Sequence, residues 1–498
     1  MSVKKKNLDV YLEEVHKQFI AIKDDDFSRA QEVFKSVFEQ IKQKMGEKCN
    51  YFKKYSSEVM YGGSVYDGTK TSKMDEFDMD IVIRLPINYD DIIMECGQPG
   101  FVRLKIGSAF DNLDKQQEWE QCHKVTREWR DTDKYLLQNK FRSWMHGIVQ
   151  KALNEMNDCA NVNGTTYLMK YKETGPAYTL YIRNVENDEE FKLDVDLVPV
   201  IRFMLPRWPK GYRTTNKVRP SCREWLVVPK PNKAVSGADR SRCWRLSFQK
   251  HERDILKDFH HLKKVLRLMK KLRTALKMKA IASYYIKTLF LWKVDKEDKQ
   301  FWQNSVSFLF GIMLQEFHDA LKQNNIPYFW NSKNNLIESL KPAQQKLYTE
   351  NLKKVLDSIQ ANDVDKIIFA FLEPDEIEQF KISEIYQRCS MSPAAAACKP
   401  SRSSSITSST SSQEQGNSQN SQMDDRQTVL LKSIVDKLDL LTQKLELQEQ
   451  RIIKLETAYE LSRKGSQKTK LEETAQVPDN MRNVNAAPQF DSDALILF

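Results

Sequence analysis

The chain has 498 residues, a hydrophobic content of 40% and a formal net charge of +10, so it is long enough for two lobes and a large core. It holds no run of about 20 apolar residues and no apolar signal-peptide core, which argues against membrane-spanning and secreted proteins. Its eight cysteines are scattered, which is typical of reduced thiols and not of a disulfide framework. We therefore expect a cytoplasmic protein without a membrane partner.

An amino-terminal helix is predicted from Phe27 to Lys54. The stretch IKQKMGEKCNYFKK in its second half carries a series of lysines, namely Lys42, Lys44, Lys48, Lys53 and Lys54. A cationic helix face of this kind is suited to contact the phosphates of a nucleic acid.

The segment EFDMDI predicts a strand with carboxylates on one face and apolar side chains on the other. Its carboxylates are those of Glu76, Asp78 and Asp80. A later strand, within FKLDVDLVPVIRF, repeats the pattern with Asp194 and Asp196. Side by side, the two strands would collect several carboxylate oxygens, which are the ligands that Mg²⁺ or Mn²⁺ requires. Glu76, Asp78 and Asp196 are therefore the candidate catalytic and metal-binding residues.

A Gly63-Ser64 step lies just upstream of the first acids. Glycine lets the backbone approach a phosphate, and serine adds a hydroxyl group. Taken singly, such a turn is usually only a turn, and an acidic strand is more often a solvated sheet face. Together they predict a two-metal site for nucleotidyl transfer, with Gly63 and Ser64 as nucleotide-binding candidates.

Residues 202–279 hold 23 Lys and Arg but only 5 Asp and Glu. Within them, Lys257–Lys279 predicts a helix with one buried apolar stripe and a cationic remainder. The alternative, a solvated basic face, is the usual outcome of a charge run, but this asymmetry favours salt-dependent binding of a polyanion. The candidate nucleic-acid-binding residues are Arg253, Lys263, Lys264, Arg267 and Lys271.

A different kind of sequence follows the predicted core. Residues 389–425 are a Ser- and Gln-rich stretch that predicts a disordered linker. Residues 426–463 carry apolar residues at alternating three- and four-residue steps, which predicts a coiled coil with the polar Gln448 in its seam. The alternative is a helix that docks on the core, but we expect a homo-oligomer. Residues 464–498 predict a disordered tail.

Three further blocks carry a family resemblance: SRCWRLSFQKHERDIL (Ser241–Leu256), VLRLMKKL (Val265–Leu272) and ASYYIKTLFLWKV (Ala282–Val294). With the acidic strands, they resemble cyclic GMP–AMP synthase and the cGAS-like receptors, members of the nucleotidyltransferase superfamily. The resemblance covers roughly residues 10–380. It implies an α+β, bilobal nucleotidyltransferase fold: a catalytic lobe with a spine helix and a mixed β-sheet over residues 1–205, and a helical lobe over residues 206–388.

The resemblance also bears on the activator. The vertebrate DNA sensor carries a zinc thumb of one histidine and three cysteines, whereas the corresponding interval here holds His260 and His261 but no cysteine. Structural zinc takes about four N or S ligands, so we expect no structural zinc. Members without the thumb resemble insect-type receptors that respond to double-stranded RNA, a duplex that a basic helical surface can grip. We therefore expect double-stranded RNA in preference to DNA.

Individual nucleotide contacts are also implied by the resemblance. Tyr284 matches a base-stacking tyrosine, with Ser283 beside it reaching toward phosphate; without the resemblance, Tyr284 would be interpreted as a core aromatic. Basic residues near phosphates or bases are matched by Lys230 and Lys270. Base-contacting positions are matched by Arg245, which equally fits a structural ion pair, and by Glu252.

The resemblance implies an enzyme of innate antiviral immunity that binds double-stranded RNA and joins ATP and GTP into cyclic GMP–AMP, with release of pyrophosphate. Three alternatives stay open: a DNA-activated synthase, a linear oligoadenylate synthase, and a non-catalytic nucleic-acid-binding relative. The full set of acids argues against the last, because isolated charges in a cleft are costly unless they bind metal.

Overall fold

The fold is described by a computed structural model that covers residues 7–390 except residues 72, 175–176 and 187–190. Apart from its first two positions, the predicted linker lies outside these residues, as do the predicted coiled coil and tail. These three segments therefore stay predictions.

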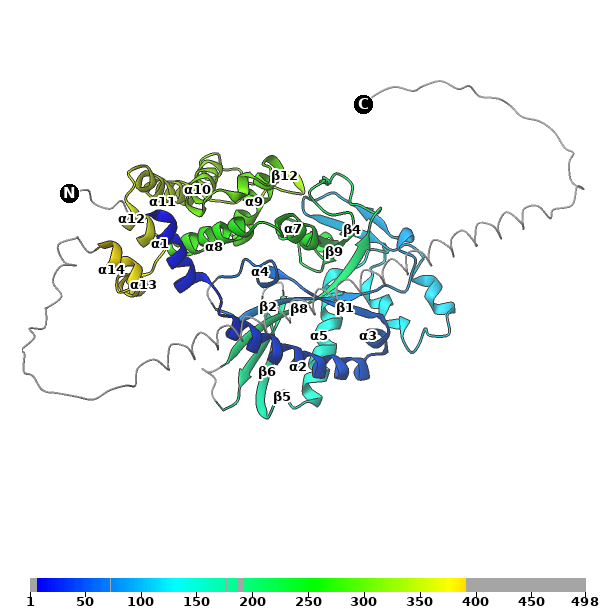
Figure 1. The fold of residues 1–498 in the computed structure, drawn as a ribbon. Helices are drawn as coiled ribbons and strands as arrows, with labels where there is room; N and C mark the ends of the chain where they lie inside the picture. The colour runs from blue at the N-terminus through cyan, green and yellow to red at the C-terminus, as the bar shows by residue number, and fades with distance from the viewer. Residues whose placement is uncertain (1–6, 72, 175–176, 187–190, 391–498) are drawn as a thin grey trace, which may run out of the picture. The chain divides into compact units, whose positions relative to one another are not determined.

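Within the described residues, ten strands form one mainly antiparallel sheet in the order β3-β4-β10-β9-β8-β7-β6-β5, and β2 pairs with both β1 and β8 (Figure 1). The β2–β8 pair is parallel, so the sheet is mixed, as predicted. The strands are β1 (Ser56–Tyr61), β2 (Glu76–Ile83), β3 (Ile93–Glu95), β4 (Phe101–Lys105), β5 (Cys159–Val162), β6 (Thr165–Thr174), β7 (Ala177–Asn184), β8 (Lys192–Met204), β9 (Glu224–Val228) and β10 (Cys243–Ser247). A separate hairpin joins β11 (Pro327–Tyr328) to β12 (Asn331–Asn335).

The helices fall into two groups. Those that precede or accompany the sheet are α2 (Asp24–Lys48), α3 (Asn50–Tyr55), α4 (Gly63–Tyr66), α5 (Gln138–Glu155) and α6 (Gly237–Arg242), with short helical turns η2 (Tyr89–Asp91), η3 (Asp111–Lys115) and η4 (His123–Trp129). The helical lobe holds α1 (Leu8–Val15), η1 (His16–Ile20), α7 (Gln249–Leu256), α8 (His260–Ala275), α9 (Ser283–Lys296), η5 (Phe301–Gln303), α10 (Val306–Lys322), α11 (Pro342–Gln360), α12 (Val364–Phe369), α13 (Pro374–Lys381) and α14 (Glu384–Ser390). No helix in the described part of the chain is long and apolar enough to cross a membrane.

The apolar face of β2 packs under the long helix α2. The ring centroids of Phe34 on α2 and Phe77 on β2 are 5.4 Å apart. Because successive strand residues alternate faces, Glu76 and Asp78 project to the opposite side of the sheet. Burial of Phe77 thus fixes the direction of the acids.

The predicted helix from Phe27 to Lys54 differs from the observed one. The helix α2 begins at Asp24 and ends at Lys48, because Cys49 is extended with φ −146°, and α3 follows. Its lysines are largely paired with acids: Lys44 and Lys48 contact Glu155, Lys42 contacts Glu39, and Lys54 contacts Glu118. The face that we predicted to be cationic is therefore partly neutralised.

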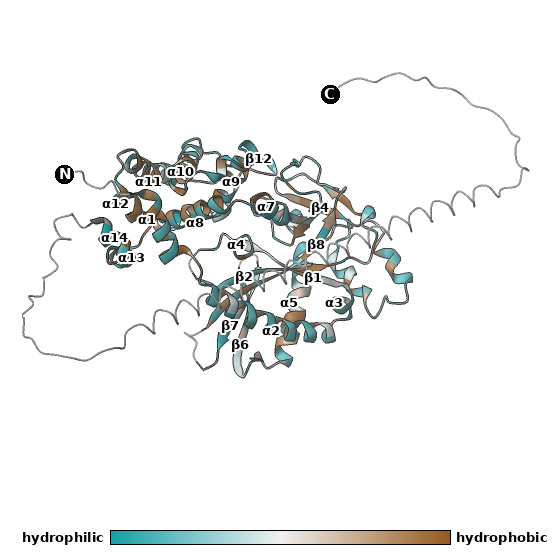
Figure 2. Cartoon of the chain, viewed as in Figure 1, coloured by the Kyte–Doolittle hydropathy of each residue, from teal (hydrophilic) through white to brown (hydrophobic). Residues whose placement is uncertain are grey.

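The apolar stripe predicted on α8 is buried: Leu262, Leu266, Met269 and Leu272 are each at most 1% exposed. Figure 2 shows brown apolar and teal polar portions along α8 and α10, as expected of amphipathic helices.

The lobes do not divide at residue 205. The strands β9 and β10 lie after this position and continue the sheet. The helix α1 lies among the helices of the other lobe (Figure 1), and its Asp9 accepts hydrogen bonds from the Ser307 backbone N–H at 2.8 Å and hydroxyl at 2.7 Å. Both lobes are thus built from segments on either side of the predicted boundary.

Candidate active site

Parallel pairing of β2 with β8 brings the three predicted acids together. Asp78 lies opposite Asp196, and Glu76 lies opposite Asp194. Carboxylate oxygens of Glu76, Asp78 and Asp196 all lie within 4.8 Å of one another. The register therefore places three carboxylates on one face of two neighbouring strands.

These carboxylates repel one another. Burial, then the charges of Glu76 and Asp196, raise the pKa of Asp78 to about 6. Burial also raises the pKa of Asp196, against a 2.5 Å hydrogen bond donated by the Thr179 hydroxyl. Three close carboxylates without thiolate or imidazole fit a hard divalent cation, which would relieve this repulsion.

Two further acids of the predicted faces are engaged with protein groups. Asp80 accepts a hydrogen bond from Gln249 of α7, and burial raises its pKa to about 7. Asp194 accepts a hydrogen bond from Arg183 at 2.6 Å. Strand alternation places them on the correct face but does not reveal these partners.

Lys70 is a neighbour of the acids that sequence reasoning missed. Its ammonium nitrogen lies 2.9 Å from Glu76 Oε2 and 3.2 Å from Asp75 Oδ1. No periodic signal marks Lys70, because it lies in the loop between α4 and β2.

The Gly63-Ser64 step lies directly against the acids. The Gly62 backbone N–H donates to the Asp78 carbonyl at 2.8 Å. Gly63 has φ +66°, and a Cβ at this position would overlap the Asp78 carboxylate. Only glycine fits here, because both the backbone conformation and the space exclude a side chain.

All eight predicted nucleotide-binding residues line a single cavity of about 360 Å³. This volume is in the range of sites for small molecules, roughly 300–1,000 Å³. The cavity also contacts Asp78 and residues that the sequence did not single out, including Asp67, Val198 and Lys287. The predicted residues are Gly63, Ser64, Lys230, Arg245, Glu252, Lys270, Ser283 and Tyr284.

Two lysines of the cavity carry poorly compensated positive charge. Burial, then the charge of Lys287, lower the pKa of Lys270 to about 8, and its ammonium group donates to the Thr69 carbonyl at 2.9 Å. Burial, followed by the charges of Arg245 and Lys233, also lowers the pKa of Lys230. An anionic ligand such as a phosphate would stabilise both charged forms.

The predicted base contacts are linked to each other. The Tyr284 hydroxyl donates to Glu252 Oε1 at 2.7 Å. The ring of Tyr284 lies 6.4 Å from that of Tyr328, between centroids, and both residues line the cavity. The predicted stacking residue therefore borders the cavity and is fixed through its hydroxyl.

Each of the five predicted nucleic-acid-binding residues is partly exposed. Arg253 donates to Asp67 at 3.0 Å and to the Tyr61 carbonyl at 2.8 Å. Burial lowers the pKa of Lys263. The sequence pattern predicts the cationic helix but not the protein groups that surround these side chains.

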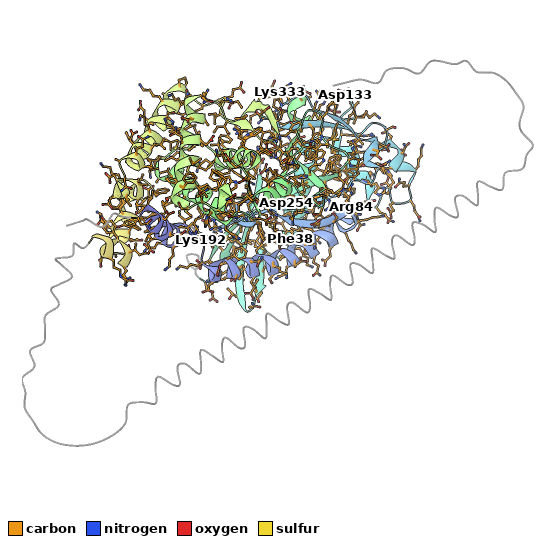
Figure 3. The ribbon with its side chains drawn as sticks, turned by 45° about the horizontal axis from the view of Figure 1, so that its top comes forward. Phe38, Arg84, Asp133, Lys192, Asp254 and Lys333 are labelled. Carbon is orange, nitrogen blue, oxygen red and sulfur yellow. The ribbon has the colours of Figure 1, made fainter. Side chains whose placement is uncertain are left out.

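The other three residues of this predicted set, all on α8, contact groups far away in the chain. Lys264 lies 2.6 Å from Glu13, and Lys271 lies 2.5 Å from Glu376. The Arg267 guanidinium donates to the Gly68 carbonyl at 3.0 and 2.7 Å. Elsewhere in residues 202–279, Asp254 of α7, labelled in Figure 3, accepts the Arg219 backbone N–H at 2.7 Å.

The adjacent histidines lie at the start of α8. One ring nitrogen of His261 is 2.8 Å from the Asn304 carbonyl. Cysteines that the structure describes are free, including Cys222 and Cys243 near this part of the sequence. The expectation of no structural zinc stays a prediction.

Two family models match this chain. Residues 65–258 match the nucleotidyltransferase domain of Mab-21 proteins, and residues 261–354 match the HhH/H2TH-like domain of Mab-21 proteins. The first match contains Glu76, Asp78 and Asp196.

Curated relatives include proteins named cyclic GMP-AMP synthase-like receptor. That of Aethina tumida is 33% identical over 375 residues, covering 73% of this chain and 91% of the relative. Those of Ctenocephalides felis and Tribolium castaneum are 33% identical over 398 and 360 residues, covering 76% and 70% of this chain and 91% and 88% of the relatives. The resemblance predicted from the sequence blocks is confirmed.

Proposed function

We propose a reaction and an activator for this chain, which belongs to the Mab-21 family of nucleotidyltransferases that includes the cyclic GMP-AMP synthase-like receptors. In this proposal, double-stranded RNA activates the enzyme to join ATP and GTP into cyclic GMP–AMP, with release of pyrophosphate. The observation that carries it is the group of Glu76, Asp78 and Asp196 beside a cavity lined by every predicted nucleotide contact.

The residues have separate roles in this reaction. Glu76, Asp78 and Asp196 would hold Mg²⁺ or Mn²⁺, which when bound stabilises the charge that develops on the transferred phosphate. The Gly63 backbone and the Ser64 hydroxyl orient the phosphates of the donor nucleotide. Asp196 lies at the acceptor side, where it orients the attacking ribose hydroxyl for in-line displacement.

Cations and aromatics of the cavity complete the nucleotide site. Lys270 and Lys230 neutralise phosphate charge. Tyr284 stacks on a base, and the neighbouring Ser283 contacts a phosphate. Arg245 contacts the second base. Because a π-face accepts any base, the same platform can hold a nucleotide in one round and the linear dinucleotide in the next.

Double-stranded RNA is the activator that we propose. Two observations support it. The interval that corresponds to the zinc thumb holds two histidines but no cysteine, and the chain is similar to receptors of insects. The duplex would bind Lys263, Lys264, Arg267 and Lys271. At Lys264 and Lys271 it would compete with the carboxylates of Glu13 and Glu376. Self-association through residues 426–463 would raise the local concentration of enzyme on a long duplex.

Product analysis tests the proposal. Purified protein is incubated with ATP, GTP and Mg²⁺, with no nucleic acid, duplex RNA or duplex DNA, and products are identified by chromatography and mass. We expect a cyclic dinucleotide when duplex RNA is added, and none with duplex DNA or without nucleic acid. Formation of linear oligoadenylates would contradict the proposed reaction. Activation by duplex DNA but not by duplex RNA would contradict the proposed activator. Intact duplex binding without any product would favour the non-catalytic alternative.

A further inference from the structure

Three ion pairs link four charged side chains at the wall of the cavity, between the turn that follows β1 and the helical lobe. Lys287 lies 2.6 Å from Asp67 and 2.9 Å from Glu252. Arg253 lies 3.0 Å from the other oxygen of Asp67, and it follows Glu252 directly on α7. Two cations and two anions thus balance each other.

Three of these four side chains are buried. Side chains of Asp67, Lys287 and Glu252 are at most 9% exposed, whereas that of Arg253 is 29% exposed. Burial alone would lower the pKa of Lys287, but the charges of Glu252 and Asp67 outweigh it and raise this pKa. Because an unpaired charge here would be costly, the three buried groups must keep their mutual distances.

The two carboxylates that Lys287 contacts reach different parts of the predicted nucleotide site. Asp67 follows the turn of α4, which begins with Gly63 and Ser64, and its backbone N–H donates to the Gly63 carbonyl at 3.2 Å. The second carboxylate, that of Glu252, accepts a hydrogen bond from the Tyr284 hydroxyl at 2.7 Å. Tyr284 and Lys287 are three residues apart on α9, so they project from one face of the helix toward the same carboxylate.

We propose that Lys287 is a positioning residue of the nucleotidyl-transfer site, which sets the separation between the phosphate-binding turn at Gly63-Ser64 and the base platform at Tyr284. The inference rests on the proposed function for the roles of these two groups. Lys287 lines the cavity, and in this role it acts through the two carboxylates that it holds, those of Asp67 and Glu252. The carboxylate of Glu252 also accepts the Trp330 indole N–H at 3.0 Å, so three protein donors hold it in place.

The test separates positioning from stability. Lys287→Met alone would leave two buried carboxylates with one cation fewer, so we expect it to lower Tm and not to be diagnostic. The double variant Lys287→Met/Glu252→Gln removes one charge of each sign, keeps the Asp67–Arg253 pair, and retains an oxygen acceptor for Tyr284. Its reference is Glu252→Gln alone, so that the difference between the two reports on Lys287.

The readouts are Tm and the Kd for a non-hydrolysable ATP analogue with Mg²⁺. We expect the double variant to bind the analogue at least about tenfold more weakly than Glu252→Gln, because a nucleotide could no longer engage the phosphate-binding turn and the base platform together with full contact. Lys287→Arg, which keeps the charge, should recover most of the affinity. The matched control is Lys293→Met, on the same helix and also paired with two carboxylates, those of Glu297 and Glu316; it should leave the Kd within about twofold.

Equal affinity of the double variant and Glu252→Gln for the analogue would overturn the inference, and a lower Tm with that result would show a purely structural role. Loss of affinity in Lys293→Met of the same size would also overturn it. The Kd does not depend on the product, so the proposed function can fail separately: wild-type protein would bind the analogue and yet form no cyclic dinucleotide. Absence of analogue binding by the wild-type protein would overturn both.

Discussion

Gly63 and Asp78 are so close that residue 63 has no room for a side chain. A Cβ on Gly63 would overlap the Asp78 carboxylate, and the backbone of Gly63 has φ +66°. The position of Asp78, a candidate metal ligand, therefore excludes a side chain at residue 63 in the proposed phosphate-binding turn.

Gly63→Ala should abolish nucleotidyl transfer, because the added methyl group displaces the Asp78 carboxylate. The positive φ adds a cost of about 1–2 kcal/mol in unfolding free energy. The measurement is turnover of ATP and GTP together with urea unfolding.

Gly107→Ala is the matched control for this change. Gly107 has φ +61°, but nothing lies within 4 Å of a Cβ placed there. It should share the stability loss and keep turnover. Similar loss of activity in both variants would show that backbone strain, and not contact with Asp78, accounts for the effect at Gly63.

The double change Glu76→Ala/Asp78→Ala should lower turnover by about a thousandfold or more, because metal ligation contributes several kcal/mol to transition-state stabilisation. Mn²⁺ binding, measured by calorimetry, should be lost as well, whereas binding of duplex RNA should be intact. Asp194→Asn is the control, since Asp194 is paired with Arg183 and lies beside the group. Retained turnover in the double variant would remove these acids from the metal site.

The face of each strand on which the acids lie was predictable, because strand alternation is local, whereas their meeting depends on the pairing of β2 with β8. Burial of Phe77 and Val195 determines the face on which Asp78 and Asp196 lie. Hard divalent cations take oxygen ligands, so the carboxylates on this face are the expected metal ligands. The same reasoning could not separate Asp80, because its partner Gln249 is 169 positions away.

The environment of the basic helix could not be predicted, for a similar reason. The helical period of α8 correctly indicates which residues are buried, since that depends on residues three and four positions apart. The partner of Lys264, however, is Glu13, which is 251 positions away in the chain. A cationic pattern alone cannot distinguish an open surface from a face covered by a distant helix.

Lys270 should make wild-type stability depend on pH. Its pKa is lowered from 10.5 to about 8 in the folded protein, so the buried charge costs about 3 kcal/mol below pH 8. Between pH 8 and 10.5 the unfolded chain binds a proton that the folded protein does not, so stability rises with pH in this window. Relative to Lys270→Met, the wild-type protein should therefore gain stability from pH 8 to 10.5, as urea unfolding would measure.

At neutral pH, Lys270→Met should be more stable than the wild-type protein and bind the ATP analogue more weakly, because the lost cation faces the proposed phosphates. Lys279→Met is the control, as Lys279 is exposed just beyond the same helix. A stability difference between wild type and Lys270→Met that does not change with pH would contradict the lowered pKa.

Lys264 and Glu13 provide a test of the proposed RNA surface, because their side chains lie 2.6 Å apart and join α8 to α1. Lys264→Glu should weaken activation by duplex RNA whether Lys264 binds phosphate or only holds α1, but it should reduce the salt dependence of activation only if Lys264 binds phosphate. The charge swap Glu13→Lys/Lys264→Glu distinguishes the two roles, since it restores the ion pair, which contributes up to about 1 kcal/mol, with reversed polarity. If RNA contacts Lys264 itself, activation measured across a salt series should stay weak in the swapped protein. Recovery of activation in the swapped protein would instead show that Lys264 serves to hold α1, and the duplex must then bind elsewhere.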